Sequence, residues 1–226
     1  KAIANSDKRG GFKDKEVIGI KNEAELRDKL EQYMLRRTKA EVLDLPPLQY
    51  LPKRVDLLPE QRKIYNQIVD DLMVEYPDGN IEDMGNALTK FLRLKQVCGT
   101  TQTFTGADIS AKLDAAIEDD IELILRGEKI GTFTQFRGVL ECYVTRLRAL
   151  NVPVFELHGG VPADTRQDVV NAWAAVKGPA VIACMIQVAG IGLNMTAASQ
   201  VSFLDKLYTP GLNKQAVDRF YRIGQD

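Results

Sequence analysis

The short apolar run Ile130-Gly131-Thr132-Phe133-Thr134 is the first of several that decide the fold of this chain. Similar runs lie at residues 152–157, 180–185 and 201–204. The segments before, between and after them carry apolar residues at helical spacing, at residues 110–125, 139–150 and 163–176 and at the C-terminus. Short strands that alternate with helices are typical of a parallel sheet that is covered on both faces. We therefore predict an α/β fold whose ligands gather at the carboxyl ends of the strands.

Residues 1–109 follow other patterns. Residues 1–21 mix lysines, glycines and acidic residues without periodicity, which predicts a loose N-terminal segment. Residues 22–109 predict a connector and a helical appendage, with helices at 23–37, from Pro59 to about residue 73, and from about residue 81 to 97. The α/β lobe is expected over residues 110–226.

The bulk properties of the chain limit its function. Its 226 residues carry a net charge of −1, so there is no global basic field and any contact with DNA requires a local patch. No run of 18 apolar residues is present, so we expect no membrane span. The three cysteines are far apart, which argues against a disulfide framework and a zinc site. We expect an intracellular protein with no metal site of its own, cytoplasmic in a bacterial or phage-infected cell and nuclear if the source is eukaryotic.

The C-terminal stretch Gln215-Ala-Val-Asp-Arg219-Phe-Tyr-Arg222-Ile-Gly-Gln225 contains two arginines at a spacing of three residues. If Asn213 caps a short helix, Gln215, Arg219 and Arg222 share one helical face. Two guanidinium groups on one face favour an anion, and phosphate is the anion that the arginine fork binds bidentately. Spacing alone leaves two interpretations open: ordinary surface arginines on a solvated helix, or the arginine fingers of a nucleotide hydrolase.

This stretch resembles motif VI of the Snf2-type ATPases, a branch of the superfamily 2 helicases. Further segments resemble other motifs of that family in the same order along the chain. They are the segment that joins the two lobes at residues 34–47, motif IV at 129–136, the glycine segment at 157–160 with Arg166, motif V at 189–194, and the Asp-x-x-Trp-Asn-Pro box at 205–210. The ordered set is far more specific than any single motif.

The resemblance implies the second, RecA-like lobe of an ATP-driven translocase of double-stranded DNA. Arg219 and Arg222 would then act as arginine fingers on ATP, and the cleft would be lined by Gln215, Gly190, Gly192 and Asn194. The resemblance also implies that strand-end groups touch DNA phosphates without reading sequence, at Thr134, Gln135, His158 and Gly159. If the resemblance is set aside, the glycines are typical of an ordinary turn. His158, Thr134 and Gln135 would then have a structural role about as often as a functional one.

The 226 residues contain no Gly-x-x-x-x-Gly-Lys-Ser/Thr loop and no Asp-Glu-x-His motif. We therefore expect ATP and Mg²⁺ to be held mainly by an N-terminal lobe of the same protein that is not part of this sequence. Met185-Ile186 stands where the family has Ser-Thr, and Tyr208 replaces a tryptophan. A degenerate, non-catalytic module that binds DNA or a protein partner is the alternative. The compact spacing of the motifs favours a bacterial or bacteriophage protein.

Strand separation favours aromatic rings on which bases stack. Near the expected strand ends, the sequence offers Phe133, Phe136 and Tyr208. We expect Phe133 to be part of the core, and Phe136 and Tyr208 to be more exposed but too far apart to form a platform. The Snf2-type resemblance implies a translocase that does not separate strands, and the lack of an aromatic platform agrees with it, so we expect a protein that tracks duplex DNA without opening it.

Overall fold

The computed structural model describes residues 2–4, 17–35, 37, 39–43, 45, 47–70, 73–75, 79, 81–83, 86–189 and 192–222. The chain divides into two compact units, residues 1–44 and residues 45–226. Each unit is described by itself below.

The first unit contains two short strands and two helices. Strand β1 (Ala2–Ala4) pairs antiparallel with β2 (Val17–Ile20), so the ends of the segment that was predicted to be loose are paired. The β-branched residues of β2 favour this conformation. Helix α1 (Glu23–Glu31) ends before the predicted residue 37, and α2 (Lys39–Val42) follows it.

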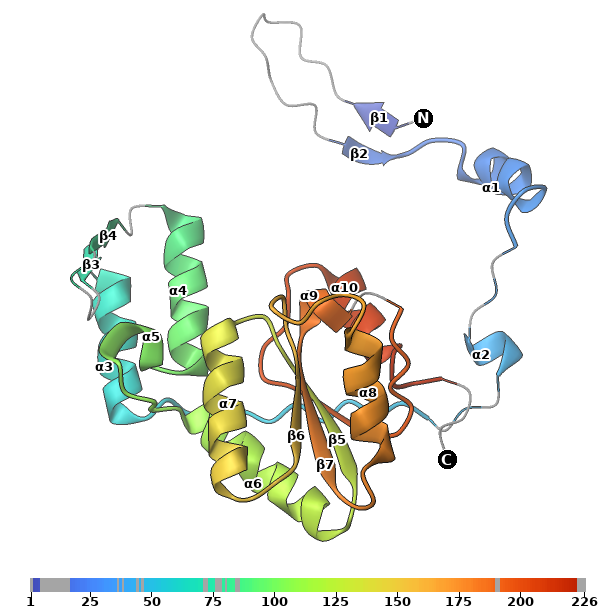
Figure 1. The fold of residues 1–226 in the computed structure, drawn as a ribbon. Helices are drawn as coiled ribbons and strands as arrows, with labels where there is room; N and C mark the ends of the chain where they lie inside the picture. The colour runs from blue at the N-terminus through green and yellow to red at the C-terminus, as the bar shows by residue number, and fades with distance from the viewer. Residues whose placement is uncertain are drawn as a thin grey trace, which may run out of the picture. The chain divides into compact units, whose positions relative to one another are not determined.

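The second unit begins with an extended stretch at residues 47–58, followed by α3 (Pro59–Asp70), β3 (Met73–Glu75), β4 (Ile81–Asp83), α4 (Ala87–Gly99) and α5 (Gln102–Thr105). The prediction of one helix from residue 81 was wrong, because β4 pairs antiparallel with β3. Helix α4 begins only after Asn86, whose side chain accepts a 2.9 Å hydrogen bond from the Leu88 amide. The helical appendage therefore also contains a hairpin (Figure 1).

A buried glutamine ties this helical region to the segment that follows it. Gln61 is fully buried; its Nε2 donates to the carbonyl of Val97 at 2.9 Å, and its Oε1 accepts from the amide of Ala111 at 2.9 Å. One side chain thus bonds to the end of α4 and to the start of α6 (Ala111–Leu125). Because a buried amide needs such partners, this contact fixes the three segments relative to one another.

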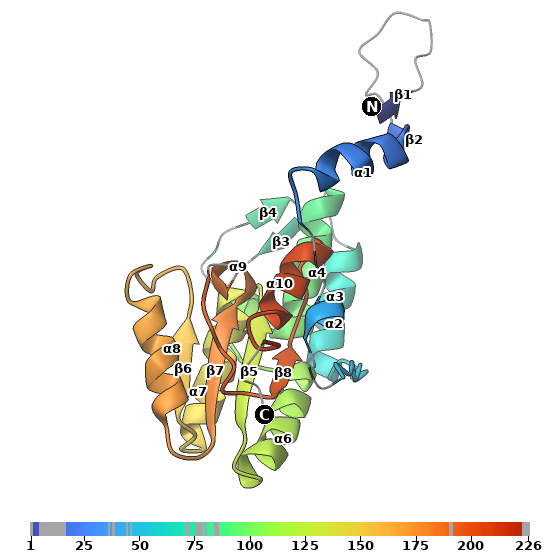
Figure 2. The ribbon, with the colours of Figure 1, turned by 90° about the vertical axis from the view of Figure 1, so that its right-hand side faces the viewer.

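The predicted parallel sheet is confirmed. It contains β5 (Lys129–Thr134), β6 (Val154–Leu157), β7 (Ala180–Met185) and β8 (Gln200–Phe203), in the order β6-β7-β5-β8, and every pairing is parallel (Figure 2). The helices that accompany the sheet are α6, α7 (Arg137–Ala149), α8 (Arg166–Ala175), α9 (Ile186–Ala189) and α10 (Pro210–Val217).

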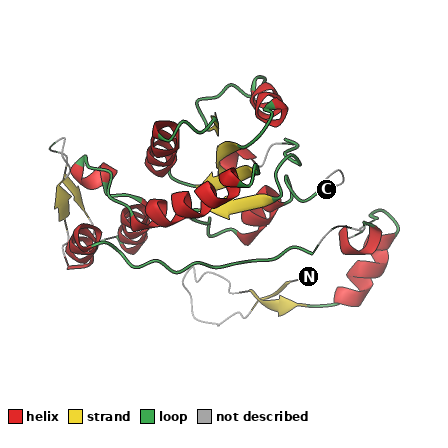
Figure 3. Cartoon of the chain, turned by 90° about the horizontal axis from the view of Figure 1, so that it is seen from below, coloured by secondary structure: helices red, strands yellow, loops and turns green. Residues whose placement is uncertain are grey.

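Helices cover both faces of the sheet, as Figures 1 and 3 show. The side chains of β7 alternate between the two faces, as a strand requires. Val181 and Ala183 pack with α6 and α7, whereas Ile182 and Cys184 pack with α8 and the C-terminal segment. Since both faces are buried, the strand is apolar throughout its length.

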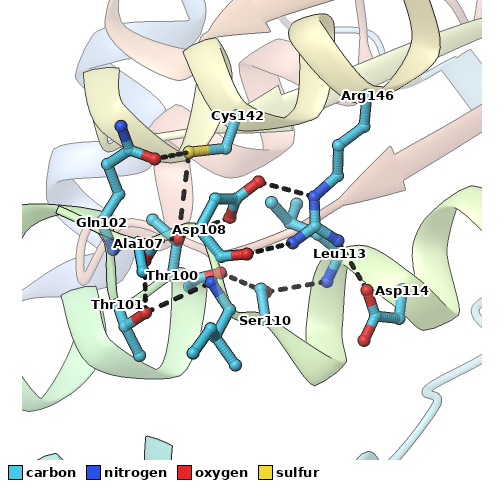
Figure 4. A network of polar contacts seen from close by, with 12 residues as sticks. Thr100, Thr101, Gln102, Ala107, Asp108, Ser110, Leu113, Asp114, Cys142 and Arg146 are labelled. Atoms are coloured by element: carbon cyan, nitrogen blue, oxygen red, sulfur yellow. Dashed lines mark hydrogen bonds and ion pairs between the residues drawn. The ribbon is translucent and has the colours of Figure 1, made fainter. Parts of the chain in front are cut away.

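A polar network joins the helical region to α6 and α7 (Figure 4). Arg146 on α7 donates from Nε to Asp108 Oδ2 and from Nη1 to Asp114 Oδ1, each at 2.6 Å. Asp108 also accepts a 2.8 Å hydrogen bond from the hydroxyl of Thr100, the residue that caps the end of α4. Burial would raise the pKa of Asp108, but the hydrogen bonds and charge of Arg146 outweigh it and the pKa is lowered. The end of α4 is therefore held against the α/β lobe by a charged pair.

The aromatic residues that the sequence placed near the strand ends differ in exposure. Phe133 is fully buried, which confirms the prediction that it belongs to the core. Phe136 is only 9% exposed, so the prediction of an exposed ring was wrong there, while Tyr208 is 64% exposed. None of the described helices combines the length and apolar character needed to cross a bilayer.

Candidate functional site

The carboxyl ends of the four parallel strands lie at one edge of the sheet. The residues that follow β5, β6, β7 and β8 at this edge are Gln135, His158, Ile186 and Leu204. The predicted DNA-contacting segments after β5 and β6, and the segment after β7 that contains Gly192 and Asn194, therefore leave the sheet at the same edge.

Asp205 organises the end of β5. The carboxylate of this nearly buried residue accepts a hydrogen bond from the Thr134 hydroxyl and one of 2.9 Å from the Gln135 amide. Thr134 is itself fully buried, so its hydroxyl has no access to a DNA phosphate. This corrects the predicted contact between Thr134 and DNA. Thr134 holds the strand end in place, and the side chain of the neighbouring Gln135 is partly exposed.

The side chain of Gln135 points toward the Asp205 loop. Its Nε2 donates to the carbonyl of Lys206 at 3.3 Å. An amide nitrogen has two donors. One N–H of Gln135 therefore remains available to an acceptor outside the protein.

His158 has a defined tautomer. Its Nδ1 accepts a 3.0 Å hydrogen bond from the amide of Gly160. Partial burial, and secondly the positive charge of Arg137, lower the pKa of the imidazole, so the ring is neutral at pH 7. A neutral ring that accepts at Nδ1 carries its proton on Nε2, which makes Nε2 a donor. Gly159 beside it is exposed, and a Cβ added there would meet no atom within 4 Å.

The terminal helix begins earlier than the sequence analysis expected. Thr209 occupies the N-cap position of α10 and Pro210 its first turn. Asn213 lies inside the helix, where its Oδ1 accepts from the Leu207 amide at 2.9 Å and its Nδ2 donates to the Leu207 carbonyl at 2.7 Å. The condition that Asn213 caps the helix is therefore not met.

Because α10 ends at Val217, Gln215, Arg219 and Arg222 do not lie on one helical face. Gln215 is exposed in the last turn of the helix, and both arginines follow in the turns after it. Arg222 Nε donates to the carbonyl of Asp218 at 2.9 Å. Partial burial, and secondly the charge of Arg222, lower the pKa of Arg219. An anion beside the two arginines would relieve both effects.

Phe220 fixes the arginine segment on the sheet. Its buried ring lies edge-on to Phe133 at 5.6 Å between centroids and to Trp173 at 6.2 Å. A Cβ on Gly131 would lie 2.2 Å from the Phe220 ring, so only glycine fits at that point of β5. The sequence analysis did not find this contact, although a glycine inside a strand is a known sign of close approach.

The segment after β7 contains the residues predicted to line the ATP cleft. Gly192 has a φ of 56°, a left-handed backbone conformation that favours glycine. Asn194 is exposed, whereas the residues on either side of it, Leu193 and Met195, are buried. Met195 N donates to the carbonyl of Arg219 at 3.0 Å, so this loop and the arginine segment are adjacent. Gly190 lies outside the described residues.

The described part of the chain contains three free cysteines and no candidate metal site. Cys98, Cys142 and Cys184 are free thiols. No cluster of three or more His, Cys, Asp or Glu side chains suited to a metal ion occurs among the residues that the structure describes.

Two protein-family models match this chain. The SNF2-related domain matches residues 12–103, and the helicase conserved C-terminal domain matches residues 112–224. The chain belongs to the Snf2-type family of superfamily 2 helicases. For an Snf2-type chain, the parallel sheet described above is the RecA-like fold that the resemblance implied.

Similar proteins occur in bacteria. An uncharacterized ATP-dependent helicase of Mycoplasma genitalium is 28% identical over 88% of this chain and 20% of its own length. The putative ATP-dependent helicase/translocase YwqA of Bacillus subtilis is 28% identical over 96% of this chain and 25% of its own. The chain thus spans about a fifth to a quarter of these relatives.

The fold also resembles a solved Snf2-type structure, the Sulfolobus solfataricus SWI2/SNF2 ATPase core. The TM-score is 0.65 at 28% identity, over 89% of this chain and 43% of that one. The same core in complex with double-stranded DNA gives a TM-score of 0.60 at 28% identity, over 90% and 44% of the two chains.

Proposed function

We propose that this chain is the C-terminal lobe of an ATP-dependent translocase of double-stranded DNA. The main support is the anchored arginine segment: Phe220 is packed against Gly131 of the central strand, with Arg219 on one side of it in sequence and Arg222 two residues further on. A solvated terminal helix needs no such anchor. In this proposal, residues 1–21 are an N-terminal segment, residues 22–109 the connector and appendage, and residues 110–226 the lobe.

The arginines have the donor set that a nucleotide phosphate requires. Each guanidinium presents planar N–H donors that match phosphate oxygens. The Arg222 Nε is used by the Asp218 carbonyl, which orients that side chain and leaves its terminal nitrogens to a ligand. Gln215, Gly190, Gly192 and Asn194 are the proposed lining of the same cleft.

The group that binds Mg²⁺ and the β- and γ-phosphates is proposed to lie on an N-terminal lobe of the same protein. The described residues offer no carboxylate cluster for a metal ion, and the 226 residues contain no phosphate loop. The relatives are four to five times longer than the matched part, which leaves room for such a lobe. Arg219 and Arg222 would stabilise the charge of the transition state from the opposite side of the cleft.

DNA is proposed to run along the edge at the carboxyl ends of β5 and β6. Gln135 Nε2, His158 Nε2 and the open backbone at Gly159 are the donors that would bind backbone phosphates there. Such contacts position a protein on DNA without reading its sequence. Thr134 takes part only through Asp205, by holding the strand end.

The test is turnover by the full-length protein with Arg219→Ala or Arg222→Ala. We expect a loss of about 10³-fold or more in ATP turnover, with nucleotide binding largely retained, because fingers act on transition-state charge. The matched control is Arg126→Ala, an exposed arginine at the end of α6 on the opposite edge of the sheet. Equal losses of binding and turnover would count against the finger role.

The alternative, a degenerate and non-catalytic module, predicts the opposite result for ATP turnover. The full-length protein would then show no DNA-stimulated ATP turnover, and the arginine variants would bind DNA or a protein partner as the unmodified protein does.

A further inference from the structure

Lys95 on α4 lies beside the proposed DNA-binding edge, although it belongs to the helical region. Its Nζ donates to the carbonyl of Lys206 at 2.7 Å. The same Nζ lies 4.5 Å from the centroid of the Tyr208 ring and 6.0 Å from that of Phe136. Two aromatic faces and one carbonyl thus hold this ammonium group in a defined place.

The charge of Lys95 is not neutralised by an ion pair. Among the described residues, no carboxylate lies within ion-pair distance of its Nζ. Partial burial lowers the pKa of Lys95; Asp205 opposes this shift and Lys112 adds to it. A partly buried ammonium group is stabilised when an anion approaches.

The ammonium group lies next to Gln135. Both Lys95 Nζ and Gln135 Nε2 donate to the same oxygen, the carbonyl of Lys206. An ammonium group has three donors, and the Lys206 carbonyl uses one of them. The remaining N–H donors of Lys95 and Gln135 therefore lie close together, at the end of β5 and after β8.

The position of Lys95 is fixed by the rest of the fold. Thr100, at the end of the same helix, is bonded to Asp108, and Asp108 is paired with Arg146 of α7 (Figure 4). Gln61 holds the carbonyl of Val97. The last turn of α4 is thus attached to α7 through Asp108 and to the start of α6 through Gln61. A ligand that binds to Lys95 is therefore connected to the α/β lobe.

We infer that Lys95 binds a backbone phosphate of DNA next to the one that Gln135 binds, so that the helical region takes part in gripping the duplex. The inference rests on the proposed function, because it extends the same DNA-binding edge. A phosphate fits because it is a compact anion that accepts from several donors at once, and the neighbouring Gln135 offers a neutral donor beside the cation.

The experiment measures binding of a duplex of about 30 base pairs by the chain over a series of salt concentrations. Lys95→Gln removes the charge and keeps a donor for the Lys206 carbonyl. We expect weaker binding and a log–log salt slope that is smaller in magnitude by about 0.9, the value for one lost phosphate contact. Lys95→Arg keeps the charge, and should keep the slope.

Lys177→Gln is the matched control, because Lys177 is exposed and precedes β7 at the opposite edge of the sheet. It makes the same change of net charge and should leave the slope unchanged. Thermal unfolding of each variant shows that the fold is retained. If Lys95→Gln destabilises the chain, the pair Lys95→Arg and Lys95→Met is compared at a temperature where both are folded.

The outcomes separate this inference from the proposed function. If Gln135→Ala reduces DNA binding but Lys95→Gln behaves as Lys177→Gln does, Lys95 is no phosphate contact and the proposed function stands. If the unmodified chain does not bind duplex DNA, the proposed DNA-binding edge fails as well. Inorganic phosphate is tested alone by thermal unfolding: stabilisation that requires Lys95 would assign the site to free phosphate and overturn the DNA contact.

Discussion

The backbone amide of Met195 donates a 3.0 Å hydrogen bond to the carbonyl of Arg219. This bond joins the loop after β7 to the arginine segment without using either side chain. Met195 is fully buried, and Phe220, next to Arg219, is buried too, so the bond lies where water does not compete. The loop that we propose to line the cleft and the arginine segment are therefore joined, and we expect them to move together when ATP binds.

This chain alone should hydrolyse ATP no faster than background. The reason is that its 226 residues contain neither a phosphate loop nor the acidic motif that holds Mg²⁺. Phosphate release from the purified chain is the measurement. Turnover above background that Arg222→Ala abolishes would contradict the proposed division between two lobes.

Duplex binding by the chain should be weak, insensitive to sequence and steeply dependent on salt. A net charge of −1 leaves only a local patch, and each phosphate contact contributes about −0.9 to the log–log salt slope. Competition between duplexes of unrelated sequence measures the specificity. A tight, sequence-selective complex that persists at high salt would favour the binding-module alternative.

Gly131→Ala should disturb the arginine segment from inside the sheet. The added Cβ would lie 2.2 Å from the Phe220 ring, and such overpacking costs about 1–3 kcal/mol of unfolding free energy. In the full-length protein, we expect ATP turnover to fall, because Phe220 is displaced together with Arg219 and Arg222.

The control for this substitution is Gly211→Ala, since a Cβ at Gly211 in α10 meets no atom within 4 Å. Alanine is the better helix former, so this variant should be at least as stable as the original chain. Unchanged melting temperature and turnover in Gly131→Ala would show that Phe220 does not position the arginines.

Ionisation of Asp120 should lower the free energy of unfolding as the pH rises from 4 to 6. Burial raises the pKa of this carboxyl group to about 6, although the Tyr143 hydroxyl donates to it. Its Oδ1 has no hydrogen-bond partner. The folded state therefore binds a proton that the unfolded state releases near pH 4, so protonation stabilises the fold and ionisation above pH 6 costs on the order of 3 kcal/mol.

Asp120→Asn removes that titration and keeps an acceptor for Tyr143. The difference in unfolding free energy between this variant and the original chain should grow in favour of the variant from pH 4 to pH 7. Asp164→Asn, at an exposed position, makes the same change of charge and should show no such trend. A constant difference for Asp120→Asn would disprove the buried ionisation.

The full-length protein should move along duplex DNA without separating its strands. Phe133 and Phe136 are buried. The exposed rings of Tyr208 and Phe91 are tilted by 48° with their centroids 5.1 Å apart, and Lys95 lies over Tyr208, so the described strand ends present no parallel stack of rings. ATP-dependent displacement of a triplex strand, with no opening of a forked duplex, is the expected pair of results. Fork opening without triplex displacement would contradict it.

The sheet could be predicted from sequence because each strand is a short apolar run between helical patterns. The burial of Phe133 followed from local patterns in the same way. The hairpin at residues 73–83 could not, since its three-residue strands are too short to show alternation, and the cap at Asn86 was missed. Thr209 and Pro210 were the true signals of the start of α10.

The site was harder to predict where contacts join distant residues. The burial of Thr134 depends on Asp205, which lies 71 residues later, and the need for glycine at position 131 depends on Phe220. Lys95 had no visible role, because its partner is a backbone carbonyl that is 111 residues away. Periodicity and motif spacing describe residues that are near one another along the chain. Contacts between residues that are far apart in sequence are determined by how the folded chain packs, so these patterns do not reveal them.

The edge-on contact between Trp173 and Phe220 allows tryptophan fluorescence to report on the position of Phe220. Trp173 is the only tryptophan in the sequence and is fully buried, with its Nε1 donating to the carbonyl of Ala180 at 3.2 Å. Its fluorescence therefore arises from a single indole in contact with the residue that anchors both arginines. Any rearrangement that shifts Phe220 changes the surroundings of that indole, so movement of the arginine segment can be followed by intrinsic emission in unlabelled protein.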